Sequence, residues 1–464
     1  MKFFNAILSA AAILFSTYLP AQVHRSPNGV GGALILPYWT TSVGNDSLLS
    51  IRNDSERASA IKLLWLDEQG GLVLSANLYL NAQSVWTGAA TDELNPRMVH
   101  LVQPNACLLP LELNQRDGAS PDVLGFPLGA PRGSMEIIEM GSIAADSSLA
   151  PEGQWIDCDT LAERWSDGPW AAEATADLLP PTGRLSANNN LINVALGGMN
   201  TIEATALGGF SDIVQHTLPN DPTPDLSDAV DADAPLGGVR SSVCLDGQCL
   251  VDEWAVPIEA VAAVLMTSRV WTDYEVIWGL SAKFEWLLHR PLDRYKTGFP
   301  GLEFGTVPLI SYYGRWSGKY VYCRNGCLVP VLPPPGALPP GTSDFPIDLE
   351  PFQHVIALVE FIRSNEGPVE VSPLLGHPIG RPLEVPDSES VGEETFSYDA
   401  GRSRFMFSEQ STPLTASSGR VFVGEPVIAI GFQQFTSIYL QGGVLANYRG
   451  TEAPRYEHTI IGPD

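Results

Sequence analysis

The sequence predicts an all-β fold, mainly antiparallel and sandwich-like, with long loops and a few short helices. The chain contains 43 Gly and 38 Pro, a composition that implies many turns and favours β structure. Near the N-terminus, short apolar segments recur roughly every 12 residues, which is the spacing of strands in a sandwich. Hydrophobic residues make up 44% of the chain, so it is too apolar to be disordered despite its charge.

The first strands are expected where apolar segments alternate with turn residues. These segments are 31–39, 47–53, 60–67 and 72–80. Their alternation is only partial, because the adjacent Leu63 and Leu64 are both apolar and must point to opposite faces of one strand. Strands that are apolar on both faces lie inside a sandwich or beneath covering loops.

The rest of the chain combines short helices with further strands. A short helix is expected around Leu161–Trp165, and the stretch 254–271 is expected to be partly helical. Strand composition returns in 274–323 and again in 352–450. The β-rich character therefore extends to the C-terminus.

Three segments are predicted to be loops from their composition. Residues 219–238 are acidic and rich in Pro, and residues 380–399 form a second acidic segment. Residues 329–346 contain repeated prolines and are expected to form a polyproline-like connector.

Residues 1–21 are typical of a secretory signal peptide, in which Lys2 precedes an apolar run that ends at the small residue Ala21. No later stretch reaches the ~18 apolar residues of a membrane-spanning helix. We therefore expect an exported protein that is periplasmic or extracellular and has no membrane span after signal cleavage. The remaining chain is divided into an N-terminal sandwich-like region, 22–240, and a C-terminal β-rich region, 241–464, and one elaborated domain is the alternative.

The charge of the chain limits its partners. Lys and Arg number 26 against 53 Asp and Glu, which gives a formal net charge of −27. Such a surface repels phosphates, so nucleic acids and anionic lipid surfaces are disfavoured. The predicted partner is a glycan or a protein of the cell envelope.

Six cysteines in an exported chain predict disulfides. The expected pairs are Cys244–Cys249, Cys323–Cys327 and, by elimination, Cys107–Cys158. In the first pair, Asp246 and Gly247 form the tip of a two-residue hairpin, and in the second, Gly326 suits a three-residue loop. A four-thiolate zinc site from the two short pairs is the alternative, but the spacings and the exported context favour disulfides.

The sequence assigns no catalytic residue. It contains no GxSxG, no HExxH, no P-loop and no dinucleotide-binding fingerprint. Glu136 and Glu139 stand out among the acidic residues as a candidate carboxylate pair, because they lie in an apolar strand. The simpler interpretation places both at the edge or rim of that strand.

Calcium is the one cofactor that the sequence suggests. Asp225, Asp228, Asp231 and Asp233 lie close together in the acidic loop, and hard cations prefer clustered oxygen ligands. The EF-hand pattern is not met, because its glycine and its closing glutamate are missing. A solvated acidic loop is the simpler interpretation, and no other cofactor is expected.

Aromatic residues suggest a ligand face, because rings stack on the apolar faces of sugars and peptides. The candidates are Tyr38, Trp39 and Trp86, together with Tyr312 and Tyr313. The ordinary alternative is that such rings are buried in the core.

The N-terminal strands follow a recognisable order, in which PYWT leads to a strand ending in Asn and then to NLYLNAQSVWT. This order resembles a group of uncharacterised exported proteins of Gram-negative bacteria. The matching residues are Pro37, Tyr38, Thr40, Asn53, Asn77, Leu78, Tyr79, Leu80, Val85, Trp86 and Thr87. The resemblance implies secretion and a β-rich fold, and it brings no catalytic residues.

The sequence therefore predicts an exported, acidic, disulfide-bonded protein that binds or assembles in the cell envelope or extracellular space and is not an enzyme. The alternative is a secreted hydrolase of glycans, esters or peptides, with a site built from distant loops.

Overall fold

The computed structural model describes most of residues 22–298 and shorter segments of the remaining chain. The described ranges are 22–101, 103–114, 123–144, 149, 156–235, 237–245, 247–277, 280–298, 309–316, 320–322, 328–330, 345–346, 355–363, 371–372, 374–377, 383–385, 388–391, 394–407, 413–437 and 446–462. The predicted signal peptide, the Cys323–Cys327 loop and most of the proline-rich connector lie outside them.

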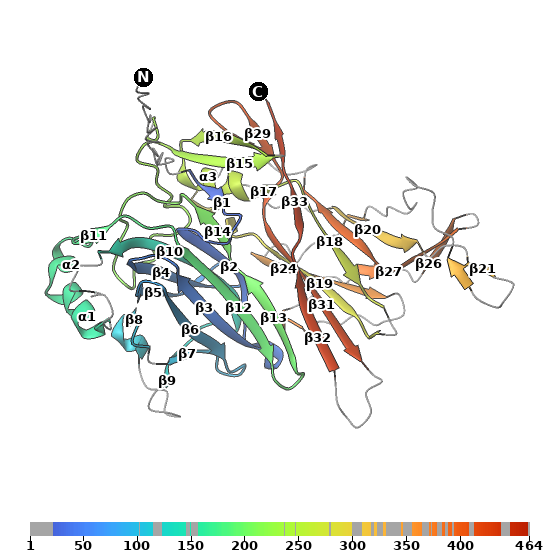
Figure 1. Cartoon of the computed structure of the whole chain (residues 1–464), viewed down its shortest axis with the longest axis horizontal. Helices are drawn as coiled ribbons and strands as arrows, with labels where there is room; N and C mark the ends of the chain where they lie inside the picture. Colours follow the sequence, from blue (N-terminus) through green and yellow to red (C-terminus); the bar gives the residue numbers. More distant parts are fainter. Residues whose placement is uncertain are drawn as a thin grey trace, which may run out of the picture.

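Two sheets form the first sandwich, seen in blue and green in Figure 1. Sheet I contains, in spatial order, β1 (His24–Arg25), β14 (Thr205–Gly208), β2 (Ala33–Thr40), β10 (Arg132–Ile143), β4 (Ala58–Asp67), β5 (Leu72–Leu80) and β8 (Ala106–Leu109), with β11 (Leu178–Leu179) on β10. Sheet II contains β13 (Gly198–Glu203), β12 (Leu185–Asn193), β3 (Asp46–Asn53), β6 (Ser84–Thr91), β7 (Arg97–Leu101) and β9 (Val123–Pro127).

Two further sheets form the second sandwich, in yellow to red in Figure 1. Sheet III contains β23 (Phe345–Pro346), β20 (Leu309–Trp316), β27 (Glu394–Met406), β18 (Arg269–Glu275) and β33 (Arg455–Glu457), with β26 (Ser388–Val391) on β27. Sheet IV contains β25 (Leu383–Val385), β24 (Ile356–Arg363), β19 (Lys283–His289), β31 (Ile428–Ser437) and β32 (Ala446–Glu452).

Small elements cover and connect the sandwiches. The helices are α1 (Cys158–Ser166), α2 (Pro169–Ala172) and α3 (Pro257–Leu265), with short 3-10 turns η1 (Ser42–Gly44), η2 (Leu111–Asn114) and η4 (Asp293–Tyr295). The small ladders pair β15 (Val239–Leu245) with β16 (Gln248–Trp254), β17 (Met266–Thr267) with β30 (Glu425–Pro426), β21 (Tyr320–Tyr322) with β22 (Leu328–Pro330), and β29 (Val421–Val423) with both β28 (Leu414–Thr415) and β34 (Thr459–Ile461).

The all-β prediction is confirmed, and nearly all of the strand pairs are antiparallel. The first four predicted strands match β2, β3, β4 and β5 to within two residues at each end. The helix predicted around Leu161–Trp165 is α1, and the partly helical stretch 254–271 contains α3 followed by β17 and the start of β18. Among the described residues, no helix combines the length and apolar character needed to cross a membrane.

The two acidic loop predictions had different outcomes. Residues 219–235 form turns and bends without helix or strand, as expected. The segment 380–399 instead contains β25, β26 and the start of β27, so the loop prediction there is wrong. The loop was predicted from acidic composition alone, whereas strand formation here depends on the neighbouring strands that tertiary structure supplies.

Burial explains why the strands of sheet I are apolar on both faces. Every residue of β2 is buried, and β4 is buried along all but its last residue, whereas β12 alternates strictly between buried and half-buried residues. One face of sheet I packs against sheet II. The other face lies beneath α1, α2, α3 and the segment around Leu226, as expected for strands under covering loops.

The strands β19, β24 and β31 of sheet IV are also buried on both faces along most of their length, and this joins the two sandwiches. Along β19, Phe284 and Trp286 pack with the inner residues of sheet III. Leu287, the residue after Trp286, points the other way and belongs to the same apolar core as the first sandwich. Phe432 of β31 and Leu358 of β24 join this shared core.

Removing an apolar side chain from this shared face should destabilise the protein strongly. We expect Phe432→Ala to lower the free energy of unfolding by about 3–5 kcal/mol, because Phe432 is fully buried and a cavity would remain. Chemical denaturation monitored by tryptophan fluorescence measures this change.

The matched control is Tyr448→Ala on the neighbouring strand β32, where the ring is 68% exposed. Its expected effect is within about 0.5 kcal/mol. A loss for Phe432→Ala as small as that of the control would show that sheet IV does not pack on the first sandwich.

Candidate functional site at the joint between the sandwiches

The joint between the sandwiches begins where two edge strands meet. β13 is the edge of sheet II and β32 is the edge of sheet IV. Thr451 donates a hydrogen bond from its hydroxyl to the carbonyl oxygen of Thr201 at 2.9 Å, and the Asn447 amide donates to the Leu196 carbonyl at 3.0 Å. Two residues on the same side of β32 therefore donate to backbone carbonyls of β13 and of the turn that precedes it, which protects an otherwise open sheet edge.

Arg449 lies between these two residues on β32 and points to the same side. A Cβ atom at Gly198 would lie 2.4 Å from the Arg449 Nε, so the arginine side chain passes close to the backbone of β13 and would have to shift if this glycine were replaced. Burial lowers the pKa of Arg449, and nearby Glu285 opposes that effect.

A loop of the second sandwich forms further hydrogen bonds with the first sandwich. The Tyr38 hydroxyl donates to the Leu375 carbonyl at 2.8 Å, and the Asn45 amide donates to the Leu374 carbonyl at 3.0 Å. Gly376 adopts a φ of +68°, and a Cβ atom there would lie 2.5 Å from the Cβ of Ser42. The loop approaches the first sandwich as closely as the backbone allows.

Glu285 is a carboxyl group fully buried in the joint. It lies on β19 directly opposite Glu360 of β24, and Ser372 donates its hydroxyl to Oε2 of Glu285 at 2.5 Å. Burial raises the pKa of Glu285 to about 8, the Ser372 hydrogen bond opposes the shift, and Glu360 adds to it. The group is therefore largely protonated at neutral pH.

Glu136 makes a second polar contact between the halves of the chain. Tyr295 of η4 donates its hydroxyl to Oε2 of Glu136 at 2.7 Å, and Arg294 Nη1 lies 3.3 Å from Oε1. Burial raises the pKa of Glu136 to about 7, and the Arg294 charge opposes this. The Leu226 backbone N–H also donates to this carboxyl group, which fixes the covering segment on sheet I.

The expectation that Glu136 and Glu139 occupy an edge or rim is wrong. β10 is central in sheet I, between β2 and β4, and both side chains are buried. Glu139 accepts hydrogen bonds from the hydroxyls of Ser59 and Thr182 and from the Gly183 N–H. Both carboxyl groups thus hold neighbouring segments in place.

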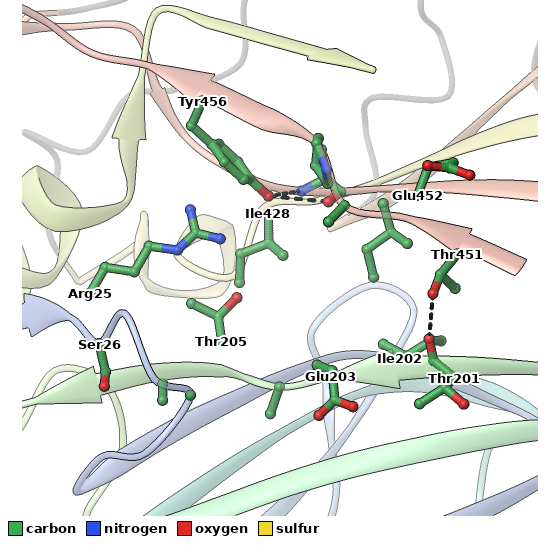
Figure 2. Close-up of a pocket in the computed structure, with 17 residues that line it drawn as sticks. Arg25, Ser26, Thr201, Ile202, Glu203, Thr205, Ile428, Thr451, Glu452 and Tyr456 are labelled. Atoms are coloured by element: carbon green, nitrogen blue, oxygen red, sulfur yellow. Dashed lines mark hydrogen bonds between the residues drawn. The ribbon is translucent and has the colours of Figure 1, made fainter. Parts of the chain in front are cut away.

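A cleft of about 260 Å³ opens at one end of the joint. Its first wall comes from β1, β13 and β14, and its second wall from β31, β32 and β33 (Figure 2). The Thr451–Thr201 hydrogen bond links the walls at one side. Ala204 and Ala206 contribute to the first wall, and Ile428 and Ile430 to the second, so much of the surface between them is apolar.

Arg25 and Tyr456 form the polar end of the cleft. The Arg25 guanidinium carbon lies 4.1 Å from the centre of the Tyr456 ring, and Figure 2 shows the side chain reaching into the space between the walls. The Tyr456 hydroxyl is bound to the N–H and carbonyl of Ala429, each at 3.1 Å, so the ring is held firmly. Glu203 and Glu452 are exposed at the rim.

The predicted aromatic ligand face is wrong. Tyr38, Trp39 and Trp86 are 0%, 0% and 1% exposed, and Trp39 packs edge-on against Trp65 inside the first sandwich. Because both faces of β2 are covered, adjacent rings on opposite faces are both buried. The side chains of Tyr312 and Tyr313 lie outside the described residues.

The calcium candidates make local contacts with the chain. Asp225 accepts from Ser227, Asp228 accepts from the Asp225 N–H, and Asp231 forms an ion pair with Arg240. The Asp233 N–H donates to Asp231. Within the part of the chain that is described, no group of three or more His, Cys, Asp or Glu side chains is placed to hold a metal ion.

Two of the three predicted disulfides are formed. Cys244 and Cys249 lie opposite each other in the β15–β16 hairpin and are bonded, and Cys107 of β8 is bonded to Cys158 at the start of α1. The third predicted pair, Cys323–Cys327, lies outside the described residues.

Sequence reasoning missed the residues of the cleft and the joint. Arg25, Thr205 and Tyr456 carried no local signal, since the cleft forms from segments more than 400 residues apart. Glu285 and Glu360 did carry one, because each is an acidic residue within an apolar strand, as Glu136 is. That criterion identifies buried carboxyl groups, but it does not say what lies beside them.

No family model, curated protein or solved structure matches this chain.

The buried Glu285 predicts a specific pH dependence of stability. Its native pKa of about 8 exceeds the ordinary value of 4.5, so between these values the folded protein holds a proton that the unfolded chain releases. This contribution to stability is complete below pH 4.5 and is lost as the pH rises towards 8, by up to about 1.4 kcal/mol per pH unit.

Glu285→Gln removes this titration. The free energy of unfolding of the variant, relative to wild type, should therefore increase from pH 5 to pH 8, as measured by urea denaturation at each pH. Glu112→Gln, at an exposed glutamate, is the control and should show no such trend. A pH-independent difference for Glu285→Gln would contradict the assignment.

Proposed function

We propose that this chain is an exported binding protein that holds a small molecule in the cleft between its two β-sandwiches. The observation that carries the proposal is the cleft itself, with walls contributed by separate sandwiches. Ligand sites occur preferentially at such interfaces, and they combine an apolar surface with a few polar groups. This cleft has that composition.

The joint supports the proposal because it holds the two walls in one relative position. The β32 side chains, the loop at Leu374–Leu375 and the shared core all connect the same two sandwiches. A site formed in advance loses less entropy when it binds its ligand than a site that must first be ordered. The volume, near the lower end of the range for ligand pockets, favours a small molecule.

Export is supported by the two disulfides, which persist in oxidising compartments, and by the sequence of residues 1–21. The residues that line the cleft include neither His nor Cys, so no Ser–His or Cys–His nucleophile is assembled among them. A binding role therefore explains the cleft better than the alternative of a hydrolase.

Filling the cleft should remove the ligand. Ala453 lines the cleft and is exposed, so Ala453→Trp adds bulk there with little effect on folding. We expect mass spectrometry of the protein, purified without denaturation from its producing cells, to detect a small molecule bound to wild type and absent from this variant.

The matched control is Ala171→Trp, an equal change at an exposed alanine of α2, which lies at the far end of the first sandwich (Figure 1). This variant should retain the molecule. Equal retention by Ala453→Trp and the control would place any ligand elsewhere and contradict the proposal.

A further inference from the structure

Arg25 contributes a cation to the lining of the cleft. In the described part of the chain, no carboxylate oxygen lies within 4.0 Å of its side-chain nitrogens. Some other arginines form ion pairs, such as Arg240 with Asp231 and Arg402 with Asp273. In a chain with 53 acidic and 26 basic residues, an arginine left unpaired in a cavity is unexpected.

The orientation of Arg25 is set before any ligand arrives. Its guanidinium lies over the face of Tyr456, whose hydroxyl is fixed by both backbone groups of Ala429. Stacking on an aromatic face leaves the N–H groups at the edge of the guanidinium free to donate. Those donors form a planar fork that matches the two oxygens of a carboxylate.

Thr205 adds a hydroxyl to the same end of the cleft. Arg25 is paired with Leu207 of β14, and Thr205 lies two residues from Leu207, so the two side chains project from the same face of this ladder. Figure 2 shows the Thr205 side chain directed into the space that Arg25 enters. A guanidinium and a hydroxyl together can satisfy one carboxylate.

The rest of the cleft restricts the class of ligand. Arg25 covers one face of Tyr456, so that face is not free to stack on a sugar. The net charge of −27 opposes the approach of polyanions, whereas one carboxylate can be bound by a local cation. Ala204, Ile428 and Ile430 provide apolar contacts of the kind that an aliphatic chain makes.

We propose that the cleft binds a small organic anion, consisting of a carboxylate on a short aliphatic body. The Arg25 guanidinium and the Thr205 hydroxyl donate to the carboxylate, and the apolar wall residues contact the aliphatic part. This inference rests on the proposed function and adds the chemical class of the ligand.

Three probes of equal length test the charge of the head group: hexanoate, hexanol and hexylammonium. Isothermal titration calorimetry of the mature protein at pH 7 should detect hexanoate with an affinity at least tenfold higher than hexanol, and hexylammonium should bind no better than hexanol. This comparison uses wild type alone, so it does not depend on the folding of a variant.

Arg25→Gln should reduce the affinity for hexanoate at least tenfold, to the level of hexanol, while leaving hexanol unchanged. The matched control is Arg402→Gln, because Arg402 also stacks at 4.1 Å on an aromatic ring, Trp271, but is paired with Asp273 outside the cleft. Arg402→Gln should bind hexanoate as wild type does. Thr205→Val should weaken hexanoate severalfold.

Several results would overturn the inference. One is hexanol or hexylammonium binding as tightly as hexanoate, another is full hexanoate affinity in Arg25→Gln, and a third is no binding of hexanoate at millimolar concentration. None of these results decides whether the cleft binds a ligand at all. If mass spectrometry finds a molecule on wild type that is absent only from Ala453→Trp, the cleft is still a binding site. If Ala453→Trp retains its ligand as the control does, and hexanoate does not bind tightly, both the proposed binding function and the inferred ligand class are contradicted.

Discussion

The structure depends on the burial of three strands of sheet IV, β19, β24 and β31, on both of their faces. One face forms the core of the second sandwich with sheet III, and the other face enters the core of the first sandwich. A two-layer sandwich normally leaves its outer faces to solvent, as β12 and β3 of sheet II do. Covering the second face of sheet IV therefore requires the other sandwich. The apolar contacts made by Leu287, Leu358 and Phe432 turn two sandwiches into one packed unit.

The other features of the joint follow from that burial. Acidic side chains that become buried between the sandwiches need hydrogen-bond or ion-pair partners, or must be protonated, because an isolated buried charge is costly. Glu285 is held by Ser372 with a raised pKa, and Glu136 is held by Tyr295 and Arg294. The same proximity brings β32 against β13 and leaves the cleft beside them. Arg25 lines this cleft, and among the described residues no carboxylate oxygen lies within 4.0 Å of its side-chain nitrogens.

The sequence was sufficient for the fold class, since the segments that became β2 to β5 are short, apolar and separated by strong turn signals. The Cys244–Cys249 hairpin could be predicted because its geometry is local. Burial could not be predicted, because it depends on what covers a strand. Trp39 and Trp86 were candidates for a ligand face, and Glu136 for a strand edge, yet all three are buried. The cleft could not be predicted from the sequence, because Arg25 and Tyr456 come together only when strands that are distant in the sequence pair.

The central claim is that the shared core makes the two sandwiches unfold as one unit. Differential scanning calorimetry of the mature, disulfide-intact protein tests it most directly. Unfolding as one unit should give one transition, with a calorimetric enthalpy of unfolding equal to the van't Hoff enthalpy, as expected when no intermediate is populated. Two resolved transitions, or a calorimetric enthalpy about twice the van't Hoff value, would show that the sandwiches unfold independently and that the shared core does not couple them.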